Sequence, residues 1–263
     1  MKKLAVLSLS GGMDSTCLLI RLLIEGFDVH CISFNYGQKH KVELERATEN
    51  IKFLQHKNFK VTHKIVDLSS IMGLFHSALT SNSIIVPEGH YEEDNMKATV
   101  VPNRNAIFSS IIYGYALSLA TEFQTNVNIS LGIHSGDHAI YPDCRPEFRD
   151  AIEHAFKIGN WDSEKVSYYT PYLESNKTTI LEDCLSNCGS LGLDFDTILR
   201  NTNTSYNPDS EGRSSGKSGA DVERIEAFLN IGRKDPVEYV DGWEVASEHV
   251  KELLKLKNES KRV

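Results

Sequence analysis

The chain begins its ordered pattern with Leu4-Ala5-Val6-Leu7-Ser8-Leu9-Ser10-Gly11-Gly12-Met13-Asp14-Ser15-Thr16. Its first part, Leu4–Leu9, is a largely apolar run, which is typical of a strand buried on both faces. A glycine pair follows, and the apolar pattern of Thr16–Ile24 predicts a helix that ends at Glu25-Gly26. A buried strand followed directly by a helix is the first unit of an α/β fold.

The next segments repeat this alternation of strand and helix. Val29–Phe34 and Val61–Val66 predict two more buried strands, and Lys39–Phe53 predicts an amphipathic helix between them. Strands and helices in this order join by right-handed crossovers into a parallel sheet that is covered on both faces. We therefore expect a doubly wound α/β fold. Further on, the pattern predicts a strand at Val127–Ile133 and helices at Ala106–Glu122, Pro146–Gly159, Thr179–Gly189, Asp221–Leu229 and Gly242–Leu256.

Two segments interrupt these periodic patterns. Residues 76–101 are polar and have no clear period, which is typical of a functional loop or lid. Between Asn201 and Ala220 the composition shifts to Asn, Ser, Gly and Thr, which predicts a turn-rich loop. We therefore divide the chain into an α/β core at residues 1–200 and a small C-terminal extension at residues 201–263.

Composition excludes several classes of protein. The 263 residues include 28 Lys and Arg against 36 Asp and Glu, so the net charge of −8 argues against stable nucleic-acid binding. No apolar run approaches the roughly 18–20 residues of a membrane span, and we expect no membrane association. The five cysteines are odd in number and widely spread along the chain, a pattern that indicates reduced thiols in the cytoplasm.

The loop between the first strand and the first helix has the chemistry of an anion site. Gly11 and Gly12 allow the backbone to approach an anion closely, because no Cβ intervenes. Hydroxyls of Ser10, Ser15 and Thr16 add donors, and the helix N-terminus adds unpaired N–H groups and a positive dipole end. The loop lacks the Gly-x-Gly-x-x-Gly of dinucleotide sites and the lysine of a Walker loop.

A second glycine-rich string, Gly212-Arg213-Ser214-Ser215-Gly216-Lys217-Ser218, superficially resembles a Walker loop. It has three residues between its glycines where that loop has four, and no buried strand precedes it. We expect no phosphate site there.

The first loop, Ser10-Gly11-Gly12-Met13-Asp14-Ser15, resembles the signature loop of the N-type ATP pyrophosphatases. Three further strings narrow the resemblance to the QueC family of 7-cyano-7-deazaguanine synthases, over essentially the whole chain. They are Phe34–His40, Val101–Asn105 and Gly136–Phe148, and the tail strings Val222–Phe228 and Asp235–Tyr239 match as well.

The resemblance implies an activity in the queuosine and deazapurine pathway. Members of this family adenylate 7-carboxy-7-deazaguanine with ATP, form the amide with ammonia, and activate and dehydrate the amide to the nitrile with a second ATP. Mg²⁺ is implied on the phosphates, held through ATP and Asp14. The expected partners are the deazaguanine substrate and ammonia, and the family often forms homodimers.

The resemblance also implies the residues of the site. The catalytic residues are expected to be Asp14, Ser15, Lys177 and Arg104, with the last two as cationic clamps on phosphate or carboxylate. The expected nucleotide contacts are Ser8, Ser10, Gly11, Gly12, Met13, Asp14, Ser15, Thr16, Ser33 and Phe34. The expected substrate contacts are Asn103, Arg104, Asn105, Asp137, His138, Tyr141, Asp143, Arg145 and Glu147.

Some of these residues have alternative roles. A guanine-like face presents two donors, which Asp143 or Asp137 could accept, yet Asp137 and His138 could equally cap a turn. Arg145 and Glu147 could form an ion pair at a helix start. Lys177 could be solvated, and Cys144 could pack in the core or line the substrate site.

The chain departs from the family at four cysteines that hold a structural zinc. Those positions are Ser205, Ser215, Ser218 and Asp221 here, and hydroxyls do not deprotonate readily to bind zinc. We therefore expect ATP and Mg²⁺ but no zinc, and a degenerate zinc loop in the C-terminal extension. An alternative is a QueC-like paralogue from an anti-phage (CBASS-type) operon that transfers the adenylated deazaguanine to a protein amine. A binding module without catalysis is a further alternative.

Overall fold

The computed structural model describes residues 3–81, 83–88, 94–136 and 140–260. In these ranges five strands form one sheet: β1 (Leu4–Ser8), β2 (Asp28–Asn35), β3 (Val61–Asp67), β4 (Val127–Leu131) and β5 (Val166–Tyr168). Their order is β3-β2-β1-β4-β5, and every neighbouring pair is parallel. The predicted doubly wound α/β fold is confirmed.

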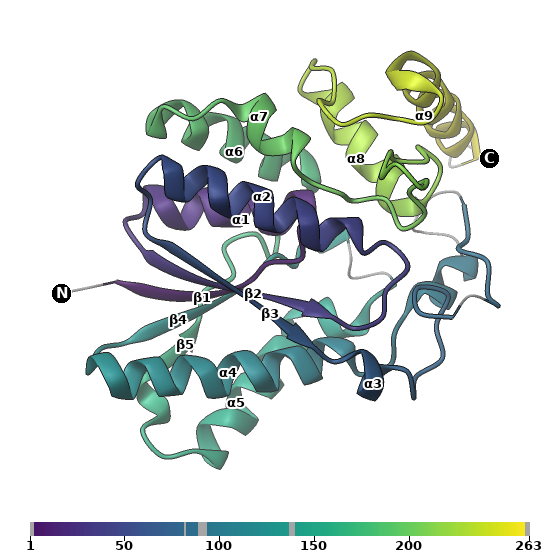
Figure 1. Cartoon of the computed structure of the whole chain (residues 1–263). Helices are drawn as coiled ribbons and strands as arrows, with labels where there is room; N and C mark the ends of the chain where they lie inside the picture. Colours follow the sequence, from purple (N-terminus) through teal and green to yellow (C-terminus); the bar gives the residue numbers. More distant parts are fainter. Residues whose placement is uncertain (1–2, 82, 89–93, 137–139, 261–263) are drawn as a thin grey trace.

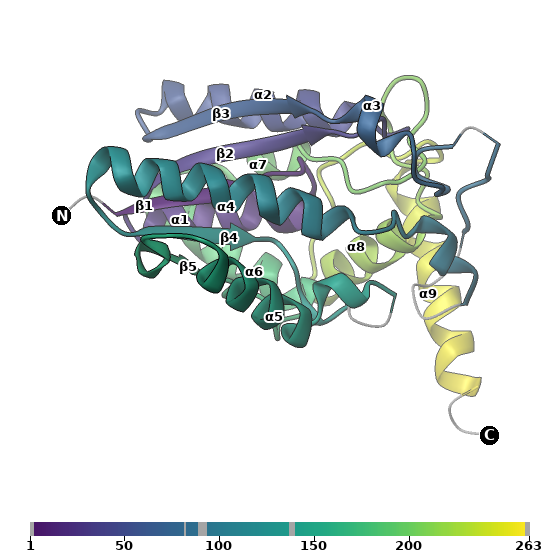
Figure 2. The ribbon, with the colours of Figure 1, turned by 90° about the horizontal axis from the view of Figure 1, so that it is seen from below.

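Helices cover both faces of the sheet (Figures 1 and 2). On one face lie α1 (Met13–Ile24), α2 (Val42–His56), α6 (Lys177–Leu191) and α7 (Phe195–Arg200). On the other face lie α4 (Arg104–Phe123) and α5 (Pro146–Gly159). The short helix α3 (Ser69–Met72) follows β3, and short 3₁₀ helices occur at Asp94–Thr99, Pro142–Cys144 and Ser163–Lys165.

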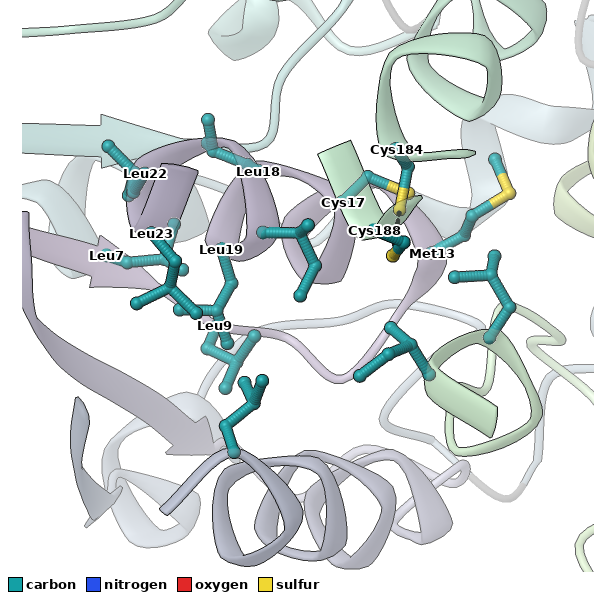
Figure 3. Packing of buried hydrophobic residues seen from close by; sticks show 14 of the residues in the cluster. Leu7, Leu9, Met13, Cys17, Leu18, Leu19, Leu22, Leu23, Cys184 and Cys188 are labelled. Carbon is teal, nitrogen blue, oxygen red and sulfur yellow. Dashed lines mark hydrogen bonds between the residues drawn. The ribbon is translucent and has the colours of Figure 1, made fainter. Parts of the chain in front are cut away.

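Helix α1 is the centre of the larger core cluster. Leu18, Leu19 and Leu22 are fully buried, as expected for a helix that is covered by β1 on one side and α6 on the other. Figure 3 shows Cys184 and Cys188 of α6 directed toward Cys17 of this helix. Each of the five cysteines is a buried free thiol. Burying each such leucine contributes about 1.5–3 kcal/mol, so α1 is held rigidly and its N-terminus is fixed in place.

The C-terminal helices pack onto the α1 side of the molecule. Helix α8 (Gly219–Asn230) packs on α6, and α9 (Gly242–Ser260) packs on α8 (Figure 1). Ser218 begins α8 with a capping box, in which its hydroxyl bonds to the N–H of Asp221 and the Asp221 carboxylate bonds back. Helix α8 is thereby fixed beside the segment that precedes it.

Several element boundaries differ from the predicted ones. Helix α1 begins at Met13 and not at Thr16, because Gly12 is extended and serves as its N-cap. Strand β4 ends at Leu131, before Gly132. A Cβ at position 132 would lie only 2.9 Å from the backbone nitrogen of Ser15, so the glycine lets the two segments approach closely. The three-residue β5 and the six-residue α7 were not predicted, since such short elements carry too few residues to show a period.

One segment in the described ranges, Met96–Phe123, is long and apolar enough to cross a membrane by length and composition. The prediction from the sequence concerned uninterrupted apolar runs, and Ser109, Ser110 and Gly114 interrupt this segment. Core helices of α/β proteins pass the same test, and α4 buries Ile112, Ala116 and Ala120 in the cluster that covers β1 and β4. Its place in the fold is that of a sheet-covering helix.

Candidate active site

A cavity of about 200 Å³ opens where β1, β2 and β4 end. It lies beside the point where the chain crosses from one face of the sheet to the other, between β1 and β4. Doubly wound sheets bind ligands at this point because the loops after the two neighbouring strands lead to opposite faces of the sheet and leave a crevice between them. Its walls are Ser8, Leu9, Ser10, Gly12, Asp14, Ser15, Phe34, Tyr36, His40, Glu43, Arg104, Asn105, Phe108, Ser109, Leu131, Gly132, Ile133, Cys144, Lys177, Asn203, Thr204, Tyr206 and Ala220.

The loop at residues 8–15, called here the nucleotide loop, forms one end of the cavity. The Ser10 and Ser15 hydroxyls are 2.9 Å apart, and the N–H of Gly12 donates to Ser10 Oγ at 3.1 Å. Gly11 has a φ of +89°, and a Cβ there would lie 2.0 Å from the carbonyl oxygen of Glu43. Two hydroxyls and the N-terminus of α1 thus meet at the cavity, as an anion site requires.

Asp14, in the first turn of α1, contacts two basic side chains. Lys177, the first residue of α6 and only 7% exposed, donates to Asp14 Oδ2 at 2.9 Å. Nζ of Lys177 also lies 2.9 Å from His134 Nε2, and that ring lies 3.8 Å from Asp14 Oδ2. Burial raises the pKa of Asp14, but Lys177 and His134 outweigh it and hold the pKa below its usual value. Asp14 is therefore an ionised carboxylate at neutral pH.

The remaining oxygen of this carboxylate is available. Asp14 Oδ1 is buried and has no hydrogen-bond partner among the described residues. An ionised oxygen without a donor, at the rim of a phosphate cradle, has the chemistry of a ligand for a hard divalent cation. Asp14 Oδ1 is thus one carboxylate oxygen of the type that Mg²⁺ takes as a ligand, while no group of three or more His, Cys, Asp or Glu in the described ranges could hold a metal.

Arg104, the first residue of α4, forms the opposite wall. Its guanidinium lies 5.8 Å from the ring centres of both Tyr36 and Tyr141. Burial lowers the pKa of Arg104, whereas Tyr36, Tyr206, Tyr141 and Asp143 raise it, and the net pKa lies above its usual value. Arg104 is a fixed positive charge in a wall of aromatic rings, which suits a flat anionic ligand.

Asn105 and Asp143 lie beside Arg104 and contact each other. The N–H of Asn105 donates to Asp143 Oδ2 at 3.3 Å, and its side-chain amide donates to the carbonyl of Asp143 at 3.4 Å. Asp143 Oδ1 is buried and has no partner among the residues that the structure describes. Asp143 itself is not one of the residues that line the cavity, so this predicted substrate contact is not placed at the wall.

The structure places the other predicted residues in three ways. Met13, Thr16 and Ser33 are buried behind the cavity wall, and Tyr141 contacts Arg104. The side chains of Asn103, Arg145 and Glu147 are exposed and are not part of the cavity wall. Asp137 and His138 lie outside the described residues. Cys144 lines the cavity, which is one of its two expected roles.

Glu43 and His40 are cavity residues that sequence reasoning missed. The Glu43 carboxyl accepts a hydrogen bond from Gln38 Nε2 at 2.8 Å and lies 3.4 Å from His40 Nε2. Burial raises the pKa of Glu43 to about 8 and, with Arg104, lowers the pKa of His40 to about 3. Both groups are therefore largely neutral at pH 7. His40 lies in the string Phe34–His40, which stood out in the sequence only through the family resemblance, and Glu43 lies in the helix that follows it.

Asn203 and Thr204 reach the nucleotide loop from almost 200 residues further along the chain. The N–H of Asn203 donates to the carbonyl of Gly11 at 2.9 Å, and the N–H of Met13 donates to Thr204 Oγ1 at 3.3 Å. Their segment was predicted to be only a turn-rich loop. No local pattern in such a loop indicates that it closes a site, so sequence reasoning missed both residues.

The four positions that correspond to the zinc cysteines of the family lie together at the start of α8. They carry three hydroxyls and one carboxylate, and these bond to one another. Among the described residues no group of three or more His, Cys, Asp or Glu could hold a metal. The side chains do not fit a structural zinc, which takes four thiolate or imidazole ligands.

The fold is a doubly wound α/β sheet with a glycine- and hydroxyl-rich loop between its first strand and first helix. The family model for "Queuosine biosynthesis protein QueC" matches residues 4–232. The chain belongs to the QueC family.

Relatives with a known role resemble the chain over nearly their whole length. It is 44% identical over 239 residues to the 7-cyano-7-deazaguanine synthase of Marinomonas sp. (strain MWYL1), covering 91% of this chain and 99% of that protein. It is 45% identical over 240 residues to 7-cyano-7-deazaguanine synthase 2 of Colwellia psychrerythraea (strain 34H), covering 91% and 99%. A solved structure, an NMN synthetase from Francisella tularensis, aligns with 12% identity and a TM-score of 0.40 over 96% of this chain and 86% of that one.

Proposed function

We propose that the chain converts 7-carboxy-7-deazaguanine, ATP and ammonia into 7-cyano-7-deazaguanine in the cytoplasm. One observation carries the proposal: in a QueC-family chain, a single cavity joins the nucleotide loop to Arg104 and Asn105. A phosphate site and a site for a flat anionic base are both needed when ATP activates the carboxylate of a deazaguanine. The synthases named above, at 44–45% identity, support the same product.

The proposed reaction has two activation steps. A carboxylate oxygen of the substrate attacks the α-phosphorus of ATP, pyrophosphate leaves, and an acyl-adenylate forms. Ammonia displaces AMP to give the amide and releases a proton. The amide oxygen then attacks a second ATP, pyrophosphate leaves again, and loss of AMP and a proton gives the nitrile.

The residues at the nucleotide end act on the phosphates. Ser10 and Ser15 donate hydroxyl hydrogen bonds, and Lys177 places a positive charge where charge develops on the leaving pyrophosphate. Asp14, which holds Lys177 at 2.9 Å, keeps that ammonium oriented toward the cavity. Mg²⁺, held through ATP and Asp14 Oδ1, would neutralise part of the triphosphate charge.

The residues at the other end recognise the base. Arg104 is a permanent cation for the carboxylate of the substrate, and Phe34 and Phe108, with ring centres 4.0 Å apart, provide an apolar wall. Asp143, which the resemblance implies as the acceptor for the amino and N–H donors of a guanine-like face, does not line the cavity and stays a prediction. Asn105 orients that carboxylate through its backbone N–H. Asn103, Tyr141, Arg145, Glu147, Asp137 and His138 stay predictions of the resemblance.

The test is product analysis by mass spectrometry with purified protein, Mg-ATP and 7-carboxy-7-deazaguanine, with and without ammonium. We expect the nitrile only with ammonium, together with AMP and pyrophosphate. AMP without nitrile would overturn ammonia as the acceptor and would direct the search to a protein amine. Absence of AMP under both conditions would overturn the proposal. Light scattering on the same sample tests the homodimer that the resemblance implies.

A further inference from the structure

Three serine hydroxyls converge on one carboxylate oxygen beside the active site. Ser205, Ser215 and Ser218 donate to Asp221 Oδ2 at 2.9, 2.8 and 2.8 Å. The backbone N–H of Ser218 adds a fourth hydrogen bond at 3.2 Å. We call these four residues the serine–aspartate cluster.

The cluster is buried and hydrogen-bonded. Asp221 and Ser205 are 0% exposed and Ser218 is 1% exposed. Burial raises the pKa of Asp221 above its usual value, and the hydroxyls of the three serines lower it, so the hydrogen bonds offset only part of the cost of burying a charge there. The other oxygen, Asp221 Oδ1, is buried without a partner among the described residues. The carboxyl group therefore depends on the donors at Oδ2 for its hydrogen bonds.

The cluster joins segments that are distant in the chain. Ser205 lies after α7, Ser215 lies in the loop, and Ser218 and Asp221 begin α8. A capping box alone needs only the last two, so the hydroxyls of Ser205 and Ser215 bind the loop to the helix in addition. In the family these four positions carry a zinc ion, whose ligands would likewise join these segments.

We propose that the serine–aspartate cluster is a metal-independent clip that replaces the zinc ion and positions the nucleotide loop. The positioning runs through two neighbours of Ser205. Asn203 donates from its side chain to the carbonyl of Ser205 at 2.9 Å and from its backbone to the carbonyl of Gly11. Thr204 accepts from the N–H of Met13. Asp221 is thus a positioning residue for ATP binding, and this part of the inference rests on the function proposed above.

The first measurement is the zinc content of the purified chain, with its melting temperature before and after a chelator. We expect far less than one zinc per chain and an unchanged melting temperature. One zinc per chain, lost to the chelator together with thermal stability, would overturn the clip. This result does not depend on any activity of the chain.

The second measurement is the Kd for Mg-ATP by titration calorimetry in Asp221→Asn. We expect a Kd about tenfold weaker, since the buried carboxyl group that accepts from three serine hydroxyls is lost. Asp209→Asn is the matched control in the same loop, because Asp209 pairs with Arg213 near the surface and should leave the Kd unchanged. If Asp221→Asn does not fold, Ser215→Ala removes one donor and should weaken ATP binding less, in the same direction.

Unchanged ATP binding in folded Asp221→Asn, or in Ser215→Ala when only that variant folds, would overturn the positioning role. If the wild-type chain binds no ATP, the proposed function and the positioning role fall together, and the zinc measurement still decides the clip. A rescue variant carries Ser205→Cys, Ser215→Cys, Ser218→Cys and Asp221→Cys together. We expect it to bind one zinc and to become sensitive to the chelator. A folded variant that takes up no zinc would show that the four positions do not share one ligand arrangement.

Discussion

Arg224 donates through Nη1 to Thr204 Oγ1 at 3.0 Å, and the same hydroxyl accepts the N–H of Met13. Arg224 lies on α8 and Met13 begins α1, so one threonine joins α8 to the nucleotide loop. Helix α8 also supplies Asp221 to the cluster and Glu223, whose carboxylate lies 3.6 Å from Lys177 Nζ. The C-terminal extension therefore forms a supporting wall of the site.

We expect Arg224→Ala to destabilise the fold by about 3–5 kcal/mol, because it leaves the buried Asp235 carboxylate without its cation. Urea unfolding measures the change. Arg233→Ala is the control, since Arg233 pairs with Asp196 at the surface and should change stability little. Equal effects of the two substitutions would contradict the buried role of Arg224.

We expect Asp14→Asn to lower pyrophosphate release about 100- to 1,000-fold, because it removes the charge that orients Lys177 and can hold Mg²⁺. Circular dichroism should show an intact fold. Asp162→Asn, at an exposed aspartate that pairs with Lys165, should release pyrophosphate at the wild-type rate. Unchanged release in Asp14→Asn would remove Asp14 from the site.

Two lysines test which glycine-rich segment contacts phosphate. Lys177 lies beside the nucleotide loop, and Lys217 lies in the Gly212–Ser218 string. We expect Lys177→Met to abolish pyrophosphate release, because the nucleotide end of the cavity loses its ammonium group and Asp14 loses that hydrogen-bond donor. Lys217→Met should retain full activity, since Lys217 is half-exposed and faces Asp241. Loss of activity in Lys217→Met would mean that the second string contacts phosphate after all.

We expect Gly11→Ala to abolish ATP binding, because its Cβ would lie 2.0 Å from the Glu43 carbonyl and would displace the nucleotide loop. Gly26→Ala is a matched control, with a similar φ of +81° and nothing within 4 Å of the new Cβ. Gly26→Ala should cost only the left-handed backbone strain of about 1–2 kcal/mol. Calorimetric titration of ATP into both variants tests this, and equal ATP affinities would contradict it.

Glu43 predicts a dependence of stability on pH. Its pKa is raised from 4.5 to about 8 by burial, so the folded chain holds a proton that the unfolded chain releases between these values. Stability from this group is complete below pH 4.5 and is lost as the pH rises through 8. Gln38 and Arg104, which face the carboxyl, lower this pKa without cancelling the effect of burial.

Glu43→Gln should therefore become more stable relative to the wild type as the pH rises through that window. The difference between the two proteins isolates Glu43 from His40, whose own lowered pKa removes stability at acid pH. Urea unfolding at both ends of the window measures it. The control Glu49→Gln, at an exposed residue beside Arg46, should show a constant difference. A constant difference for Glu43→Gln would contradict the raised pKa.

Much of the fold could be predicted because buried strands and amphipathic helices have a local signature. Leu4–Leu9 and Val29–Phe34 were predicted as strands within one or two residues of β1 and β2. The nucleotide loop was found for the same reason, since its glycines and hydroxyls are consecutive. The start of α1 was misplaced, because an extended glycine can cap a helix without a polar side chain.

The second half of the site could not be predicted from spacing. Thr204 and Met13 are 191 residues apart, and their contact depends on how α8 packs on α6. The positions of the serine–aspartate cluster were found through the family resemblance, as places that had lost their metal ligands. That the replacements bond to one another follows only from their convergence in space.

The contact of Asn203 and Thr204 with the nucleotide loop has a consequence for the order in which the protein is made. A ribosome has synthesised every strand of the described sheet once residue 168 is added. The growing chain then still lacks the segment that contacts Gly11 and Met13, and the helix that holds this segment ends only at Asn230. The polypeptide can therefore assemble its sheet during translation before its ATP site is complete. ATP binding is then among the last properties that the folding chain acquires.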